Sequence, residues 1–262
     1  MAKKRRILIA ALLAVVLGGF AWIVLRQYQS EPVYGGKPLS VWLGGYYINN
    51  VGVFPKADEA VQHIGTNAIP TLLHFLRARD SNLKLKFIAL AQRLHVININ
   101  FVPAYSRNYA AMKAFRVLGA DARDAVPALV KILEQNISEE SQYQTALALG
   151  SIGSPAKKAV PALLRLAADT NNPSRRPAAS ALAKIQAEPE LVVPVLIKLL
   201  QDPQPGVRLG AADSLRSFGA AAKPAVPTLI KIFQDPENAV RVHATNALKA
   251  IDPEAATKAG VK

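Results

Sequence analysis

Apolar residues recur along most of the chain at positions i, i+3, i+4 and i+7, which is the spacing of one face of an α-helix. Two segments depart from this pattern. Residues 7–25 form an apolar run without charge or proline, and residues 95–103 alternate between apolar and polar positions. The pattern as a whole predicts an all-α fold.

The helical pattern repeats with a nearly constant period. A proline preceded by two small or branched apolar residues, and followed two places later by leucine, recurs at almost equal intervals. These prolines are Pro127, Pro161, Pro194 and Pro227, and the first interval is one residue longer than the other two. Self-similarity at a fixed period of this length is the signature of a repeat architecture.

A second motif precedes each proline in the same register. It consists of two small residues, an apolar residue directly after them, another apolar residue three places later, and usually a glycine. Its five copies are Ala111, Ala114, Phe115, Leu118, Gly119; Thr145, Ala148, Leu149, Ile152, Gly153; Ala178, Ala181, Leu182, Ile185; Ala211, Ser214, Leu215, Phe218, Gly219; and Ala244, Ala247, Leu248, Ile251.

Each period is expected to be a pair of helices. The small residues of the first helix allow close approach of a neighbour, and the glycine can adopt the left-handed conformation that ends a helix. The proline opens the second helix, where its missing N–H is tolerated. One pair cannot cover its own apolar face, so the pairs are expected to stack into a solenoid.

These motifs resemble the HEAT-repeat family, in particular the short repeats of phycobilisome-lyase-like proteins. The resemblance implies a right-handed α-α superhelix. It also implies a ladder of hydrogen bonds between successive repeats, formed by an Asp six places before an Arg at each turn. The ladder residues are Asp169, Arg175, Asp202, Arg208, Asp235 and Arg241. At the preceding turn Gln135 and Ser141 occupy the two places, so that junction is expected to be looser or differently packed.

An earlier, divergent unit with a shortened inner loop extends from Ala57 to Leu72 and contains Pro70. The interval from Pro70 to Pro127 is much longer than the period of the later units, which indicates an insertion at about residues 80–106. A helix is expected within it, over residues 83–94. An insertion in a solenoid lies on one face or edge, so the segment is interpreted either as an N-terminal cap or as an element that meets a partner.

The N-terminus has the features of a membrane anchor. Lys3, Lys4, Arg5 and Arg6 precede the apolar run of residues 7–25, which would span about 28 Å as a helix. The positive-inside rule then places the N-terminus in the cytoplasm and the repeats on the periplasmic side of an inner membrane. The alternative is a signal peptide cleaved after Ala21, which would release the repeats as a secreted protein.

The expected organisation divides the chain into five parts. They are a basic cytoplasmic flank (1–6), a transmembrane signal-anchor (7–25), a juxtamembrane linker with a short helix (26–50), a HEAT-like array (51–252) and a C-terminal tail or cap (253–262).

The net charge of +14, from 32 Lys and Arg against 18 Asp and Glu, points to an anionic partner. Without the four N-terminal cations, the rest of the chain is still basic. A cation follows each unit-defining proline by four places: Lys131, Arg165, Lys198 and Lys231. Because the resemblance implies that second helices line the concave surface, these cations form a candidate binding row for an acidic protein partner. The alternative is a set of solvated positions where lysine favours helix formation and solubility.

The sequence contains no pattern that indicates catalysis. It has no cysteine, no His-Glu dipeptide, no P-loop and no dinucleotide-binding glycine motif. Aromatic residues make up only 6%, too few for stacking on single-stranded nucleic acid. We therefore expect a non-catalytic protein-binding scaffold without a cofactor or metal. The alternative is an exported enzyme or enzyme-maturation factor of the bilin-lyase-related group.

Overall fold

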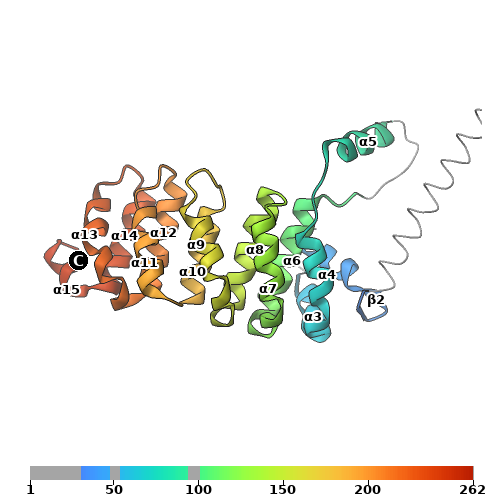
Figure 1. The fold of residues 1–262 in the computed structure, drawn as a ribbon, viewed down its shortest axis with the longest axis horizontal. Helices are drawn as coiled ribbons and strands as arrows, with labels where there is room; N and C mark the ends of the chain where they lie inside the picture. The colour runs from blue at the N-terminus through green and yellow to red at the C-terminus, as the bar shows by residue number, and fades with distance from the viewer. Residues whose placement is uncertain (1–30, 48–53, 94–100, 262) are drawn as a thin grey trace, which may run out of the picture.

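A computed structural model describes residues 31–47, 54–93 and 101–261 of the 262-residue chain. The helices of the repeats stack side by side into an elongated array that runs from α3 to α15 (Figure 1). Buried side chains from all the repeat units form one continuous apolar core along this array. The expected all-α solenoid is confirmed for the repeat region.

Each unit contributes one helix to each of two layers. The first helices are α3 (Phe54–Ile64), α6 (Ala104–Leu118), α8 (Glu139–Ile152), α10 (Arg175–Ile185), α12 (Pro205–Ser217) and α14 (Asn238–Ile251). The second helices are α4 (Ile69–Leu76), α7 (Val126–Gln135), α9 (Val160–Ala168), α11 (Pro189–Leu199) and α13 (Val226–Lys231). A final short helix, α15 (Pro253–Lys258), packs against α14.

The first helices pack closely because small residues line their contacts. Helices α6, α8, α10, α12 and α14 touch in succession, and the paired alanines of the second motif are buried between them. At Gly150 on α8 the approach is closest, since a Cβ atom there would lie 2.8 Å from the Cα of Ala181 on α10. The second helices make fewer contacts with one another, and each packs against the first helix of the following unit.

Short 3₁₀ segments connect the two helices of most units. They are η2 (Gly65–Ala68), η3 (Gly119–Ala125), η4 (Ser154–Ala159) and η5 (Gly219–Ala225); η6 (Ile232–Gln234) follows α13. Gly119 and Gly153 adopt the positive φ values that the glycine motif requires. In the unit that lacks the glycine, Gln186 takes a φ of 52° instead, and the following helix begins at Pro189 rather than beside the motif proline.

Residues 31–47 cover the N-terminal end of the stack. A two-stranded hairpin of β1 (Val33–Tyr34) and β2 (Lys37–Pro38) leads into α2 (Leu39–Leu43) and η1 (Gly44–Tyr46). Both α2 and η1 pack on α3, and Leu39 and Leu43 are completely buried there. Within the described residues, this segment therefore closes the end of the array.

Within the described part of the insertion lies helix α5 (Asn82–Arg93), which projects away from the array (Figure 1). Asp80 joins the two ends of the insertion, because its carboxylate accepts a hydrogen bond from the Ala104 N–H (2.7 Å) and pairs with Lys84 (2.7 Å). Burial raises the pKa of Asp80, but these hydrogen bonds outweigh it and hold the pKa below its usual value.

The expected transmembrane segment at residues 7–25 lies outside the described residues. Across residues 31–47, 54–93 and 101–261, no helix combines the length and apolar character that crossing a membrane requires.

Candidate functional site

The four cations of the expected binding row lie on the exposed sides of successive second helices. Lys131 is on α7, Arg165 on α9, Lys198 on α11 and Lys231 on α13, and all four are exposed. Helix α7 contacts α9, and α9 contacts α11, so the first three cations stand on adjoining helices. Lys131, Lys198 and Lys231 make no ion pair with any residue that the structure describes.

Arg165 differs from the other three because it is already paired. Its Nη2 atom donates a hydrogen bond to Oε1 of Glu134 on α7, at 2.5 Å. Both side chains are more than half exposed, so the pair is screened by solvent. The uncompensated charge of the row is consequently concentrated at its three lysines.

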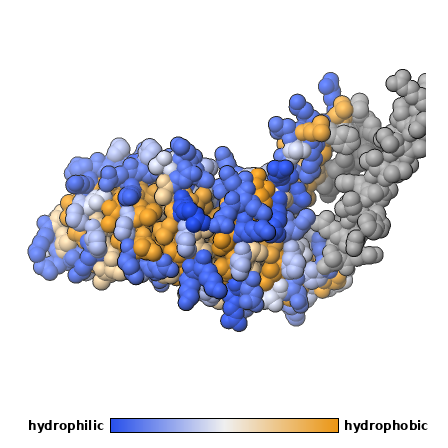
Figure 2. Space-filling model, viewed as in Figure 1, coloured by the Kyte–Doolittle hydropathy of each residue, from blue (hydrophilic) through white to orange (hydrophobic). Residues whose placement is uncertain are grey.

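Apolar side chains accompany the cations one position earlier in each second helix. Val130, Leu164 and Ile197 are partly exposed, and Ile230 is 39% exposed. On the face seen in Figure 2, apolar surface gathers over α9 and α11 between hydrophilic bands. The second-helix face therefore presents alternating apolar and cationic positions, which is the composition of a surface suited to a mixed acidic and apolar segment.

The ladder residues Arg175 and Arg208 each form an ion pair with an aspartate of the following repeat. Arg175 Nε and Nη2 donate to the two carboxylate oxygens of Asp202, at 2.7 and 3.0 Å. Arg208 makes the same bidentate contact with Asp235, at 2.7 and 2.8 Å. Each arginine thus reaches the aspartate of the following repeat, 27 places later in the sequence. Arg241 donates to the carbonyl oxygen of Asp235, at 2.7 Å.

Asp202 and Asp235 are held ionised by these contacts, whereas the expectation for Asp169 was wrong, because it pairs with no arginine among the described residues. Burial raises the pKa of Asp202, but the hydrogen bonds from Arg175 and from the Gln204 N–H outweigh it, so the pKa lies below its usual value. The hydrogen bond from Arg208 lowers the pKa of Asp235, against a smaller opposing effect of burial. Arg175 and Asp202 are each only 2% exposed, which makes this pair the most deeply buried of the ladder contacts.

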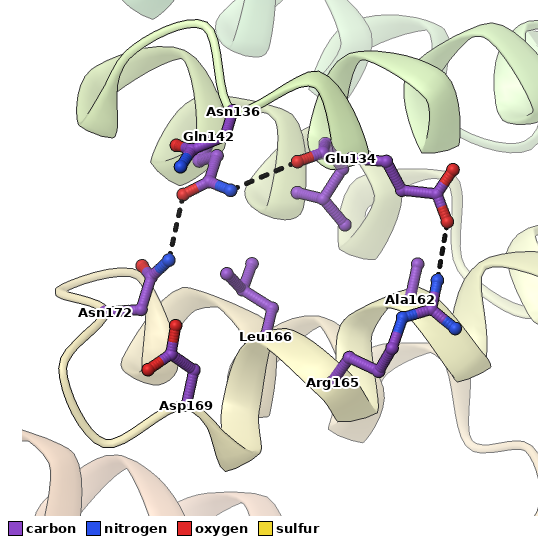
Figure 3. A pocket seen from close by; sticks show the side chains of 9 residues that line it. Glu134, Asn136, Gln142, Ala162, Arg165, Leu166, Asp169 and Asn172 are labelled. Carbon is purple, nitrogen blue, oxygen red and sulfur yellow. Dashed lines mark hydrogen bonds and ion pairs between the residues drawn. The ribbon is translucent and has the colours of Figure 1, made fainter.

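At the junction before Arg175, the place that arginine holds in the later repeats is taken by Gln142. The assignment of this place to Ser141 was wrong by one residue. The additional residue of the first, longer interval lies in the turn between α7 and α8, so counting back from the first-helix motif reaches Gln142. Its side chain donates to the Leu133 carbonyl (3.1 Å) and accepts from Asn172 (3.0 Å). This junction therefore has the neutral Asn172–Gln142 hydrogen bond (Figure 3) where the later junctions have a bidentate ion pair.

Sequence reasoning also missed Asn108 as the equivalent residue one repeat earlier. Its amide donates to the carbonyl oxygens of Phe75 (2.7 Å) and Leu76 (3.0 Å) at the end of α4. Asn108, Gln142 and Arg175 follow one another at the period of the repeats. This regular spacing could have identified Asn108 and Gln142 as equivalents of Arg175, but the residue type differs at each of the three positions.

The described histidines do not gather into a metal-binding group. His63 stacks on Tyr34 with ring centroids 4.8 Å apart, and His243 Nδ1 lies 2.7 Å from Asp213 Oδ1. Within the described part of the chain, no three His, Asp or Glu side chains come together in a way that could hold a metal ion.

This architecture defines the chain as an α-solenoid repeat protein. A family model of HEAT repeats matches residues 106–183 and 193–259, which is more than half of the chain. The chain belongs to the HEAT-repeat family.

No curated protein matches the chain significantly. Among solved structures, the designed armadillo repeat protein YIII(Dq.V1)4CPAF in complex with peptide (KR)4 is 17% identical, with a TM-score of 0.47, over 82% of this chain and 99% of its own.

Proposed function

We propose that this HEAT-repeat protein is a non-catalytic scaffold that binds a protein partner along its second-helix face. The observation that carries the proposal is the set of exposed lysines without an ion pair among the described residues, Lys131, Lys198 and Lys231, which stand at equivalent positions of three of four successive units. A solenoid presents such positions at regular intervals, so a partner can meet several of them at once.

The chemistry of this face favours an extended acidic segment that also carries apolar side chains. The lysines supply a positive potential for carboxylates, and the apolar positions one residue earlier supply area that a partner can cover. Neighbouring packed helices lie about 10 Å apart. A row of four positions therefore needs roughly ten extended residues, at about 3.3 Å each.

The test uses a fluorescein-labelled peptide of twelve glutamates and the full-length chain. Charge reversal along the row, with Lys131, Lys198 and Lys231 each changed to Glu, should weaken peptide binding by at least about tenfold, since three attractive contacts become repulsive. Binding to the unchanged protein should also weaken as salt rises. Circular dichroism should show unchanged helicity in the variant.

A matched control carries the same change in charge elsewhere. Arg123, Lys157 and Lys223 lie in the 3₁₀ segments rather than on the exposed sides of the second helices, and all three are exposed. Reversal of these three cations to Glu should leave most of the affinity. Equal losses in both variants would contradict the proposed row, because they would show a response to net charge alone.

We further propose that residues 7–25 anchor the repeats on the extracytoplasmic side of the membrane, as the order of basic and apolar residues favours. Protease added to intact spheroplasts should then digest the repeats without any disruption of the membrane. Complete protection of the repeats would refute this orientation. Release of soluble repeats lacking residues 1–21 would favour the cleaved signal peptide instead.

The phycobilisome-lyase-like resemblance stays a proposal about ancestry. The alternative of an exported lyase or enzyme-maturation factor gains no support from a metal site, because no three His, Asp or Glu side chains in the described part of the chain could hold a metal ion together.

A further inference from the structure

Helix α5 projects from the N-terminal end of the array instead of packing along it (Figure 1). In the sequence it lies between α4 and α6, which pack on each other at that end. The end of the stack is already covered by residues 31–47, because α2 and η1 pack on α3 there. Helix α5 is therefore available for a contact outside the array.

Two exposed leucines lie on one face of α5. Leu83 is 81% exposed and Leu90 is 53% exposed. They are seven places apart, which is close to two helical turns, so they share a face. Ile88, on the other side of the helix, is only 9% exposed. In Figure 2, apolar surface is visible among the hydrophilic side chains of this projecting segment. The leucine face thus offers apolar area that a partner can cover.

Cations lie on the same face as these leucines. Lys86 follows Leu83 by three places and Arg93 follows Leu90 by three places, so leucine and cation alternate along the face. Both cations are exposed, and neither forms an ion pair with a described residue. The sequence of α5 contains no acidic residue. Exposed leucines among unpaired cations are typical of a helix that lies on an anionic lipid surface.

The sequence before the described residues limits how far this end of the array can be from a membrane. The apolar run proposed as the anchor ends at residue 25, and the segment that packs on α3 begins at Glu31. The five residues between them span at most about 18 Å, even when fully extended. Helix α5 is itself about 18 Å long. An anchor at residues 7–25 would therefore hold the unit that carries α5 within reach of the bilayer.

We propose that α5 lies on the anionic surface of the membrane that holds the anchor. Leu83 and Leu90 would enter the boundary of the acyl chains, while Lys86 and Arg93 would contact lipid phosphates. The inference rests on the proposed anchoring by residues 7–25. It does not involve the lysine row, whose members stand on α7, α11 and α13. Docking of α5 would hold the array at a second point and limit its rotation about the five-residue tether.

The experiment uses the full-length chain in vesicles, with a nitrobenzoxadiazole fluorophore at position 90. The chain has no cysteine, so Leu90→Cys provides a single thiol for the label. The vesicles contain phosphatidylglycerol and phosphatidylcholine in equal parts, with a quenching spin label on some acyl chains. The fluorophore should be quenched, and its emission should move to shorter wavelength. In vesicles of phosphatidylcholine alone, quenching should be at least about fivefold weaker, since they lack the negative surface potential.

Leu191→Cys provides the matched label, because Leu191 is 54% exposed and lies on α11, several units away from α5. A fluorophore there should stay unquenched in both kinds of vesicle. Lys86→Glu with Arg93→Glu should reduce the quenching at position 90 by at least about fivefold. Arg123→Glu with Lys157→Glu changes the net charge equally and should leave that quenching unchanged. Circular dichroism should show the same helicity in all variants.

Flotation of the vesicles on a density gradient separates this inference from the proposed anchoring. A protein that floats with the vesicles, but is quenched no more at position 90 than at position 191, would overturn the docking of α5 and leave the anchoring intact. A protein that does not float with either kind of vesicle would overturn both. Equal quenching at position 90 in the two kinds of vesicle would overturn the contact between the cations and anionic lipid.

Discussion

At the scale of single residues, the first helices depend on small side chains where their backbones meet. Gly150 lies within α8, where glycine ordinarily lowers helix stability by about 1 kcal/mol relative to alanine. Its retention has a steric explanation, because an added Cβ would meet the Ala181 backbone at 2.8 Å. Such a contact cannot be relieved by rotating a side chain.

Gly150→Ala is therefore expected to destabilise the protein by about 1–3 kcal/mol, through overpacking between α8 and α10. Gly206 on α12 provides the control, since no atom lies within 4 Å of its added Cβ. Gly206→Ala should be neutral or stabilising. Urea unfolding of both variants measures the difference, and a stabilised Gly150→Ala variant would contradict the close approach of the two helices.

At the scale of helices and their junctions, the buried Arg175–Asp202 pair joins two repeats. Asp202→Ala would leave the Arg175 guanidinium buried without its carboxylate, and the loss of one partner from a buried pair costs about 3–5 kcal/mol. The exposed pair Lys258–Glu254 is the comparison, because both side chains are at least 75% exposed. Glu254→Ala should change stability by less than about 0.5 kcal/mol. Similar losses in the two variants would contradict this ranking.

The same junction predicts how stability depends on pH. The pKa of Asp202 is lower in the folded protein than its ordinary value of 3.8, so the folded state binds a proton less readily than the unfolded state does. This stabilisation is complete above the unfolded pKa and is lost as the pH falls through the folded pKa. The free energy of unfolding should therefore decrease below about pH 4.

Urea unfolding at pH 7, 4.5 and 3 measures that decrease. Asp202→Asn cannot titrate, so its stability should fall less between pH 4.5 and pH 3 than the stability of the unchanged protein. An identical acid response in the two proteins would show that other carboxylates account for it.

At the scale of the whole molecule, stability is distributed over repeats and the contacts between them. The junction at Gln142 has a single neutral hydrogen bond where the later junctions have bidentate ion pairs. We expect the backbone amide of Gln142 to exchange with solvent roughly tenfold faster than that of Arg208, although both donate to a carbonyl four places earlier.

Hydrogen exchange of the native protein measures this difference. In Gln142→Ala the amide at position 142 should exchange faster still, because the junction then loses its hydrogen bond with Asn172. Equal protection of the two amides in the unchanged protein would show that helix packing alone determines the stability of the junctions.

The sequence by itself determined the repeats, their period and the class of fold. Pro127 and its equivalents recur at nearly equal intervals, and local rules for helix ends and for small residues at helix contacts act within each period. The candidate lysines could be named for the same reason, since equivalent positions of a repeat share one face. A regular sequence pattern was therefore sufficient to predict the fold and the residues that share a face wherever the structure repeats regularly.

Only the tertiary structure decided which residues meet across the repeats. The pairing of Arg175 with Asp202 rather than with Asp169 depends on how one unit is placed on the next, and so does the contact between Arg165 and Glu134. One extra residue in the turn before α8 moved the ladder position to Gln142, and the fold pairs Gln142 with Asn172 rather than with Asp169. Spacing along a chain describes one helix at a time, whereas packing between helices determines which side chains share a space.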